Sequence, residues 1–397
     1  MAALSAVGLF GIAAPPAAAD DGVPLNSGEC NFPSDPIKGT PWSLQRLLFD
    51  QMWAETRGQN VKVAVIDTGV DDQNGQIAPA LGRGKDVIAK GNGTNDEVGH
   101  GTKVAGIIAA QPDSRTGFVG IAPKAKIIPI RQNDNEKSGT VPKMVAAIDY
   151  AVDQGANIIN ISQGTNTKLD PGSDLEKAVK RATSQDILVV ASAGNDGASG
   201  QEKDTYPAAF DGVLAVAASD RNNERAAFSQ PGDFVDIAAP GVDMVSTVPG
   251  DGHCVDQGTS FAAPYATGVA ALIMSKHPKW TPEQVIWHME KTAERVRPDR
   301  DDNVGWGVVD PVAAMSDNTE PTGPPTPDTA RAGASADNIY PAKLTLGETP
   351  QERRTRYGIY VFAGGLAMLG VVVGSSVAIR DWRRKNSISG NGEAVHG

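Results

Sequence analysis

The sequence predicts an α/β fold with a mostly parallel central sheet covered by helices on both faces, followed by one membrane-spanning helix near the C-terminus. Short continuous runs of Val, Ile, Leu and Ala alternate with longer amphipathic segments, as in sheets whose strands are buried on both faces. A separate run, residues 358–379, contains no charged side chain and is long enough to cross a bilayer as a helix.

The composition fits a globular head and excludes a basic nucleic-acid-binding surface. The chain has 397 residues, of which 40% are hydrophobic, enough for two or three structural units. Its formal net charge is -11, and its basic residues are scattered until the C-terminal end, whereas nucleic-acid binding needs a basic face. We therefore expect no nucleic-acid partner.

The cysteines and carboxylates do not predict a metal site or a cofactor. Cys30 and Cys254 lie far apart and neither belongs to a Cys/His cluster. Dispersed carboxylates such as Asp71, Asp72 and Asp96 lack a recognisable calcium-ligand spacing. In an exported chain, an even number of cysteines permits a single disulfide between them.

The N-terminus has the features of a secretory signal peptide. Residues 1–19 form an apolar stretch that ends in the small residues Ala17, Ala18 and Ala19 before Asp20. No Lys or Arg precedes this stretch, so either the true start lies upstream or the signal is atypical. Residues 20–41 would then form a short N-terminal extension of the mature chain.

The C-terminal part predicts a tethered membrane anchor. Residues 316–357 are rich in Pro, Gly, Thr and Ser and are expected to be an extended linker. Arginines flank the span 358–379 on both sides, so the cleavable signal decides the orientation. We expect the head outside the plasma membrane and residues 380–397 in the cytoplasm.

The globular head, residues 42–315, alternates predicted strands and helices. The predicted strands are residues 61–67, 125–131, 157–162, 186–193 and 212–219. The predicted helices are residues 101–111, 141–155, 173–185 and 261–275. Ligands of such sheets bind at the carboxyl ends of the strands, so polar residues at these ends are the candidate functional residues.

Four polar residues beside glycines occupy this edge, in the order Asp67, His100, Asn195 and Ser260. Each has an ordinary interpretation when taken alone: an Asx turn, a polar residue at a helix start, an Asn-Asp-Gly turn and a helix cap. Together they supply the groups that peptide hydrolysis needs: a hydroxyl, an imidazole base, a carboxylate and an amide donor for the oxyanion.

The segments around these residues are "AVIDTGV", "GHGTKVAGIIA", "SAGN" and "GTSFAAP". They are similar, in the same order, to the four signature segments of subtilisin-like serine proteases, over roughly residues 42–314. Three further segments, "QRLLFDQMWAETRGQNVKVAVIDTG", "GFVGIAPKAKIIPIRQ" and "NVGWGVVDPVAA", together with the predicted signal, linker and span, resemble the mycosins. Mycosins are membrane-anchored subtilases associated with type VII secretion in actinobacteria. The resemblance implies the three-layer subtilisin fold.

The resemblance implies a catalytic role for each of the four residues. Ser260 would attack the scissile carbonyl, and His100 would act as general base and then as general acid. Asp67 would orient and stabilise His100, while the Asn195 side chain and the Ser260 backbone N–H would hold the oxyanion. Ser260 would also be placed at the start of its helix, where a cap and a nucleophile are compatible.

The resemblance also implies that the substrate binds as an added strand between two chain segments. The segments and the pocket behind them would comprise Ser138, Gly139, Thr140, Ser162, Gln163, Gly164, Ala191, Ser192, Ala193 and Gly194. Asp196, next to this pocket, is interpreted as a solvated turn carboxylate rather than as a selector of basic side chains.

The cysteines depart from the resembled subfamily. Mycosins often place the partner of the early cysteine just before the catalytic histidine, where this chain has "NDEVGH", so Cys254 is the remaining partner for Cys30. Residues 20–41 are too short for a folded inhibitory prodomain. We therefore expect the extension to wrap the head without needing cleavage for activity.

Three functions fit these features. The first is a membrane-anchored serine endopeptidase that cleaves protein or peptide substrates through an acyl-enzyme and acts with a type VII secretion membrane complex. The alternative is mainly a structural scaffold of that complex, with proteolysis secondary. A sugar- or wall-binding module without catalysis has only the exported architecture in its favour, and the complete set of catalytic residues argues against it.

Overall fold

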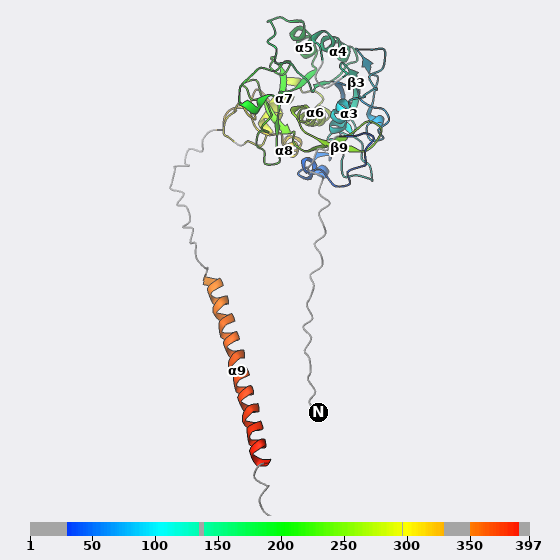
Figure 1. The fold of residues 1–397 in the computed structure, drawn as a ribbon. Helices are drawn as coiled ribbons and strands as arrows, with labels where there is room; N and C mark the ends of the chain where they lie inside the picture. The colour runs from blue at the N-terminus through cyan, green and yellow to red at the C-terminus, as the bar shows by residue number, and fades with distance from the viewer. Residues whose placement is uncertain (1–29, 135–138, 296, 329–349, 389–397) are drawn as a thin grey trace, which may run out of the picture. The chain divides into compact units, whose positions relative to one another are not determined.

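The computed structural model describes residues 30–134, 139–295, 297–328 and 350–388 (Figure 1). The chain divides into two compact units, Met1–Thr329 and Ala330–Gly397. The first contains the head and the second contains a long helix, and each is described by itself. The predicted signal peptide, residues 1–19, and the first part of the extension lie outside the described residues.

A parallel sheet forms the centre of the head, in the strand order β2-β3-β1-β4-β5-β6-β7. Its strands are β1 (Lys62–Asp67), β2 (Lys85–Asp86), β3 (Lys126–Arg131), β4 (Ile158–Ile161), β5 (Leu188–Ser192), β6 (Val213–Ser219) and β7 (Ile237–Pro240). An antiparallel hairpin of β8 (Met244–Thr247) and β9 (His253–Asp256) lies outside this sheet. The five predicted strands are confirmed, each within two residues of its predicted bounds.

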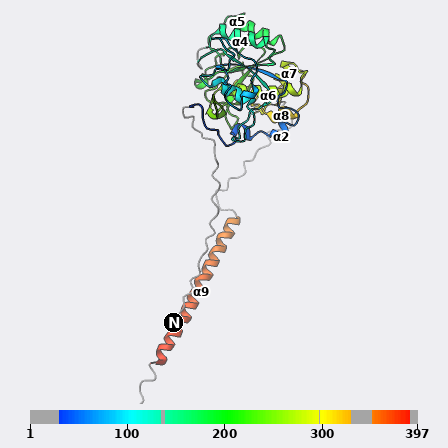
Figure 2. The ribbon, with the colours of Figure 1, turned by 90° about the vertical axis from the view of Figure 1, so that its right-hand side faces the viewer.

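Helices cover both faces of the sheet. They are α1 (Trp42–Gln45), α2 (Phe49–Met52), α3 (His100–Ala109), α4 (Val141–Asp153), α5 (Asp174–Thr183), α6 (Thr259–Lys276), α7 (Pro282–Thr292) and α8 (Pro311–Ser316). The four predicted helices correspond to α3, α4, α5 and α6, and α4 and α5 lie side by side in both views of the ribbon (Figure 1 and Figure 2).

Alternation along β1 divides its apolar side chains between two of the cores of the head, one on each face of the sheet. In β1, Val63 and Val65 join the core that contains α3 and α6, whereas Ala64 and Ile66 join the core that contains α4 and α5. All four side chains are fully buried. This period of two places a helical layer on each face of the sheet and gives the predicted three-layer architecture.

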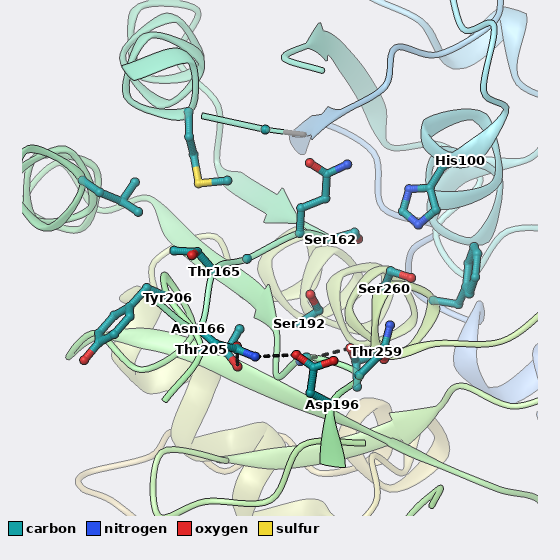
Figure 3. A pocket seen from close by; sticks show the side chains of 18 of the residues that line it. His100, Ser162, Thr165, Asn166, Ser192, Asp196, Thr205, Tyr206, Thr259 and Ser260 are labelled. Carbon is teal, nitrogen blue, oxygen red and sulfur yellow. Dashed lines mark hydrogen bonds between the residues drawn. The ribbon is translucent and has the colours of Figure 1, made fainter. Parts of the chain in front are cut away.

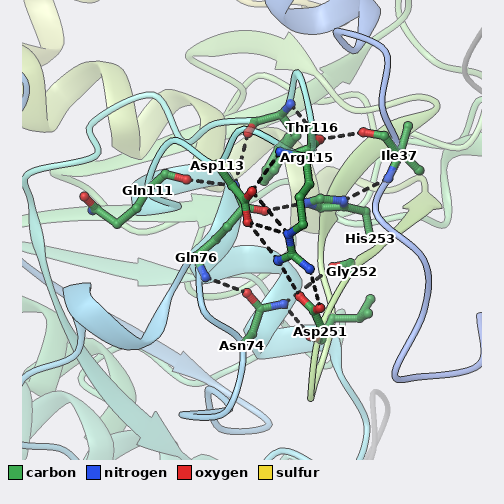
Figure 4. A network of polar contacts seen from close by, with 12 residues as sticks. Ile37, Asn74, Gln76, Gln111, Asp113, Arg115, Thr116, Asp251, Gly252 and His253 are labelled. Carbon is green, nitrogen blue, oxygen red and sulfur yellow. Dashed lines mark hydrogen bonds and ion pairs between the residues drawn. The ribbon is translucent and has the colours of Figure 1, made fainter.

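The N-terminal extension lies along the head from Cys30 onward, as expected. Cys30 forms a disulfide with Cys254, which confirms the predicted pairing. Ile37 donates its backbone N–H to Nδ1 of His253 at 3.1 Å, and Nε2 of His253 lies 2.6 Å from Oε1 of Gln76 (Figure 4). Main-chain hydrogen bonds to residues 117 and 251 continue this attachment. The neutral imidazole of His253 thus joins the extension to the head.

The first part of the expected linker also contacts the head. The guanidinium of Arg295 donates to the carbonyl of Thr326 at 3.1 Å and to the carboxylate of Asp328 at 2.9 Å. Asp328 in turn donates its backbone N–H to the carbonyl of Pro298 at 2.7 Å. Residues 317–328 therefore lie against the head, while residues 329–349 are outside the described part of the chain.

The second unit contains α9 (Pro350–Ile388), which includes the predicted membrane span. Within it, Arg353–Arg384 has a mean hydropathy of 2.0 over its most apolar window and is long enough to cross a membrane. Its described side chains are exposed, as expected for a helix that has no protein core around it.

Candidate active site

The four candidate catalytic residues converge at one edge of the sheet. Asp67 is the last residue of β1, and His100 is the first residue of α3. Asn195 follows β5, and Ser260 is the second residue of α6. His100, Asn195 and Ser260 line one cleft of about 470 Å³, and Figure 3 shows His100 and Ser260 on the same side of it.

Asp67 and His100 form a buried pair. Oδ1 of Asp67 lies 2.7 Å from Nδ1 of His100, and the Asp67 side chain is fully buried. The same oxygen accepts the backbone N–H of Thr68 at 2.8 Å. A carboxylate can only accept, so Nδ1 of His100 carries the donated proton and Nε2 is the basic nitrogen of the neutral ring. This tautomer is the one required of a general base.

Asp96, whose spacing in the sequence predicts no calcium site, is a structural residue of the site. Its carboxylate accepts hydrogen bonds from the hydroxyls of Thr68 and Thr102 at 2.8 and 2.6 Å. It also accepts the backbone N–H groups of Gly99 and Thr102, each at 2.8 Å. Burial raises the pKa of Asp96, and these hydrogen bonds oppose the rise. Asp96 thereby fastens the turn after Asp67 to the start of α3. Its position four residues before His100 in the sequence is the signal that could have identified Asp96 as a residue of the site.

The start of α6 differs from the prediction that Ser260 caps the helix. The N-cap is Gly258, and no side chain makes a cap hydrogen bond there. A Cβ at Gly258 would lie 2.9 Å from Oγ of Ser260 and 3.3 Å from Nδ2 of Asn195. The glycine therefore leaves open the point at which the serine hydroxyl and the amide donor converge.

Thr259 orients the Asn195 amide. Its backbone N–H and its hydroxyl both donate to Oδ1 of Asn195, each at 2.9 Å. The hydroxyl of Thr259 also accepts the N–H of Gly194 at 3.1 Å. Since Oδ1 is occupied, the Nδ2 group of Asn195 is the part of the amide presented to the cleft.

The cleft includes most of the expected substrate-binding residues. Those that line it are Gly139, Thr140, Ser162, Gln163, Gly164, Ser192 and Gly194. Ser138 lies outside the described residues. Ala191 and Ala193 are fully buried and do not line the cleft, because their side chains join the hydrophobic cores.

Several lining residues were not identified from the sequence. Met144 and Leu175 come from α4 and α5, while Asn166, Thr205 and Tyr206 lie on the side away from His100 (Figure 3). The first two lie in predicted helices to which no part in substrate binding was assigned, and the loop residues carry no motif.

Asp196 is exposed, as interpreted from the sequence, and it also lines the cleft. Its Oδ2 accepts a hydrogen bond from Nδ2 of Asn166 at 2.5 Å. The carboxylate is thus held at the rim of the cleft by the loop that contains Asn166.

Comparison with curated proteins gives relatives along most of the head. The chain is 40% identical to M-protease of Shouchella clausii over 261 residues, which are 64% of this chain and 65% of that protein. It is 39% identical to subtilisin Savinase of Lederbergia lenta over 261 residues, which cover 64% of this chain and 92% of the relative. The aligned part thus spans just under two thirds of the length of M-protease.

Solved structures of secretion-associated proteases are also similar. The MycP3 protease from the type VII (ESX-3) secretion system matches with a TM-score of 0.64 and 34% identity, covering 71% of this chain and 89% of that chain. MycP1 from Mycobacterium smegmatis matches with a TM-score of 0.63 and 28% identity, covering 81% and 91%. The model of the subtilase family matches residues 58–307, which contain the four candidate catalytic residues. The chain belongs to the subtilase family.

Proposed function

We propose that this chain is a membrane-anchored serine endopeptidase in which Asp67, His100 and Ser260 form the catalytic triad. The observation that carries the proposal is the buried Asp67–His100 pair, 2.7 Å apart, at the edge of the cleft that Ser260 lines. Membership of the subtilase family and the identity to subtilisins support the same activity.

Acylation begins when Oγ of Ser260 attacks the scissile carbonyl carbon. Nε2 of His100 takes the hydroxyl proton, and Asp67 stabilises the imidazolium that forms. The Nδ2 group of Asn195 and the backbone N–H of Ser260 stabilise the negative carbonyl oxygen. When the C–N bond breaks, His100 returns the proton to the amine, and the acyl group stays on Ser260.

Deacylation repeats these steps with water. The water oxygen attacks the ester carbon while His100 takes a proton from the water. The C–Oγ bond then breaks, His100 gives that proton to Oγ of Ser260, and the carboxylic acid is released. Residues 139–140 and 162–164 are suited to hold an extended substrate between them, because main-chain groups on both sides can pair with a bound strand.

The apolar helix α9 would anchor the protease in the plasma membrane with its head outside the cytoplasm. Its length and hydropathy support the anchor, and the predicted signal peptide supports the orientation. The similar structures MycP3 and MycP1 are described as proteases of type VII secretion systems. We extend that association to this chain, with protein or peptide substrates and an actinobacterial host.

A fluorophosphonate probe tests the catalytic proposal, because it reacts with an activated serine. The wild type should be labelled and Ser260→Ala should not. Ser184→Ala is the matched control, since Ser184 is an exposed residue at the end of α5, and it should keep the label. A folded wild type that does not react would refute the catalytic triad.

The role in secretion is tested in cells that lack the chain. If a Ser260→Ala gene restores secretion as well as the wild type does, the scaffold function is the main one. If secretion returns but particular secreted proteins stay uncleaved, those proteins are the substrates of the protease.

A further inference from the structure

Lys103 is a buried cation on α3, the helix that begins at His100. Its side chain is only 6% exposed, and Nζ lies 2.5 Å from Oδ2 of Asp256. Asp256 is the last residue of β9, four residues before Ser260, and its other oxygen accepts the N–H of Gln257 at 2.8 Å. The ion pair therefore joins the helix of the proposed base to the segment that leads into the proposed nucleophile.

Phe261, the residue after Ser260, lies beside both His100 and Lys103. Its ring centroid lies 5.3 Å from that of His100, and Nζ of Lys103 lies 5.7 Å from the same ring. Residues three apart on a helix face the same side, so the ammonium and the imidazole are neighbours along α3. Phe261 is almost completely buried, and charges beside it are poorly screened by water.

The backbone of α3 has separate attachments that do not use the ion pair. Ser246 and Thr247 on β8 donate their hydroxyls to the carbonyls of Lys103 and Thr102, at 2.6 and 2.9 Å. β8 also pairs with β9 through the register of Met244 with Asp256. Because these contacts remain when the charges are removed, the electrostatic effect of the pair can be separated from its effect on folding.

Charged side chains near the start of α3 and the cleft that His100 lines come from several elements, among them Asp196 at the rim of the cleft. Asp67 lies on β1, Asp96 precedes α3, Lys103 lies on α3 itself and Asp256 lies on β9. Within the described residues, β8 and the first turn of α6 add no titratable side chain. The positive charge of Lys103 disfavours protonation of the imidazole, and the negative charge of Asp256 opposes that effect.

We propose that the Lys103–Asp256 ion pair is a positioning pair that aligns His100 with Ser260 and whose two charges offset each other's effect on the proton affinity of the His100 ring. The inference rests on the proposed function only in naming His100 as the base. While the two charges are paired, neither one alone shifts the balance between the neutral and the protonated imidazole. They also hold β9 against α3 at the point where the two catalytic segments meet.

The proposal predicts opposite effects of the two charges. In Lys103→Met, the loss of the cation leaves Asp256 unpaired, so the pKa of His100 rises. In Asp256→Asn, the buried ammonium is left unpaired and the pKa of His100 falls. Each shift should be about 0.5 pH unit, and Lys103→Met/Asp256→Asn should return close to the wild type. Lys103→Arg keeps the charge and should show no shift.

The experiment measures the rate of fluorophosphonate labelling against pH for the full chain in detergent micelles. The acid limb of this profile reports the pKa of the free base. Opposite displacements in the single variants, with recovery in the double variant, support the proposal. Two outcomes would overturn the proposal: slower labelling with an unmoved acid limb, or acid limbs of the two single variants that move in the same direction. A pair with a purely structural role would give either result.

A wild type that is not labelled refutes the protease proposal and leaves a second measurement for the ion pair. NMR titration of carbon-13-labelled His100 in the same variants reads the imidazole pKa without catalysis. Opposite shifts of its midpoint would still support the proposal, and equal midpoints would overturn it. Circular dichroism of each variant checks that the head is folded.

Discussion

The side-chain oxygen of Asn195 accepts two hydrogen bonds from Thr259, one from the backbone N–H and one from the hydroxyl, each at 2.9 Å. The arrangement fixes which end of the amide faces the cleft. An oxyanion donor is effective when it is already oriented, because no reorganisation is then needed as charge develops. Thr259 is therefore expected to contribute to catalysis by orienting Asn195.

Thr259→Val should lower turnover by about tenfold with little change in KM, because it removes one of the two hydrogen bonds and keeps the shape of the side chain. Asn195→Ala should cost more, since loss of this kind of donor lowers turnover by about 10²- to 10³-fold in subtilisin itself. Steady-state kinetics on a peptide substrate provides the measurement. Wild-type turnover in Thr259→Val would show that the backbone N–H alone orients the amide.

The Cys30–Cys254 disulfide closes a loop with a sequence separation of 224. Cys30→Ser/Cys254→Ser should lower the free energy of unfolding by about 2–5 kcal/mol, because the unfolded chain regains the entropy that the cross-link removed. Denaturant unfolding of the oxidised wild type and the double variant measures the difference. Addition of a reductant should destabilise the wild type alone, and equal stability of the two proteins would contradict the prediction.

His253 should make the attachment of the extension sensitive to acid. Burial lowers the pKa of His253 to about 4, against the opposing charges of Asp251 and Asp113, with Arg115 adding to the decrease. The neutral ring is needed because Nδ1 accepts the N–H of Ile37. The stabilisation is complete above the unfolded pKa of 6.5 and is lost as pH falls toward 4. At pH 5 the loss should be about 2 kcal/mol.

Hydrogen exchange at the Ile37 amide, corrected for intrinsic rates, measures this effect. Protection should fall between pH 7 and pH 4.5 in the wild type. His253→Gln keeps an acceptor and a donor without a titratable group, so its protection should stay constant over the same range. Equal losses in the two proteins would assign the acid sensitivity to another group.

The central strands could be predicted because strands buried on both faces consist of continuous apolar residues. β7 (Ile237–Pro240) could not, since four residues that include two alanines and a proline also fit a loop. α7 had a signal that was not used: Thr281 and Gln284 form a capping box at its start. Local sequence thus predicts the elements that have a clear apolar pattern, whereas β7 lacks such a pattern and the start of α7 is marked by its cap.

The catalytic residues could be predicted because each lies in a motif beside a strand end or a helix start. The contacts that hold them could not. Asp96 and the Lys103–Asp256 pair join segments distant in sequence, and only the fold brings those segments together. Ala191 and Ala193 show the same limit, because the direction of a side chain at the end of a strand depends on the pleat and on its neighbours.

Glu290 on α7 is a buried acid outside the active site, and its side chain makes the stability of the head depend on pH. Burial raises the pKa of Glu290 to about 8, and the neighbouring Asp236 carboxylate adds to the rise. The unfolded value is near 4.5, so the folded state binds more protons between these values. The resulting stabilisation is complete below pH 4.5 and is lost as pH rises through 8.

Glu290→Gln should remove this pH dependence, because the amide resembles the protonated acid at every pH. At pH 5 the variant should unfold at the same temperature as the wild type. At pH 9 it should be more stable by up to about 4 kcal/mol, since the wild type must then bury a charge or take up a proton. Thermal unfolding of the full chain at the two pH values measures the difference.

Glu283→Gln, at the exposed start of the same helix, is the matched control and should follow the wild type. If Glu290→Gln also follows the wild type at pH 9, then Glu290 is ionised in the folded head at no cost, and burial does not govern its titration.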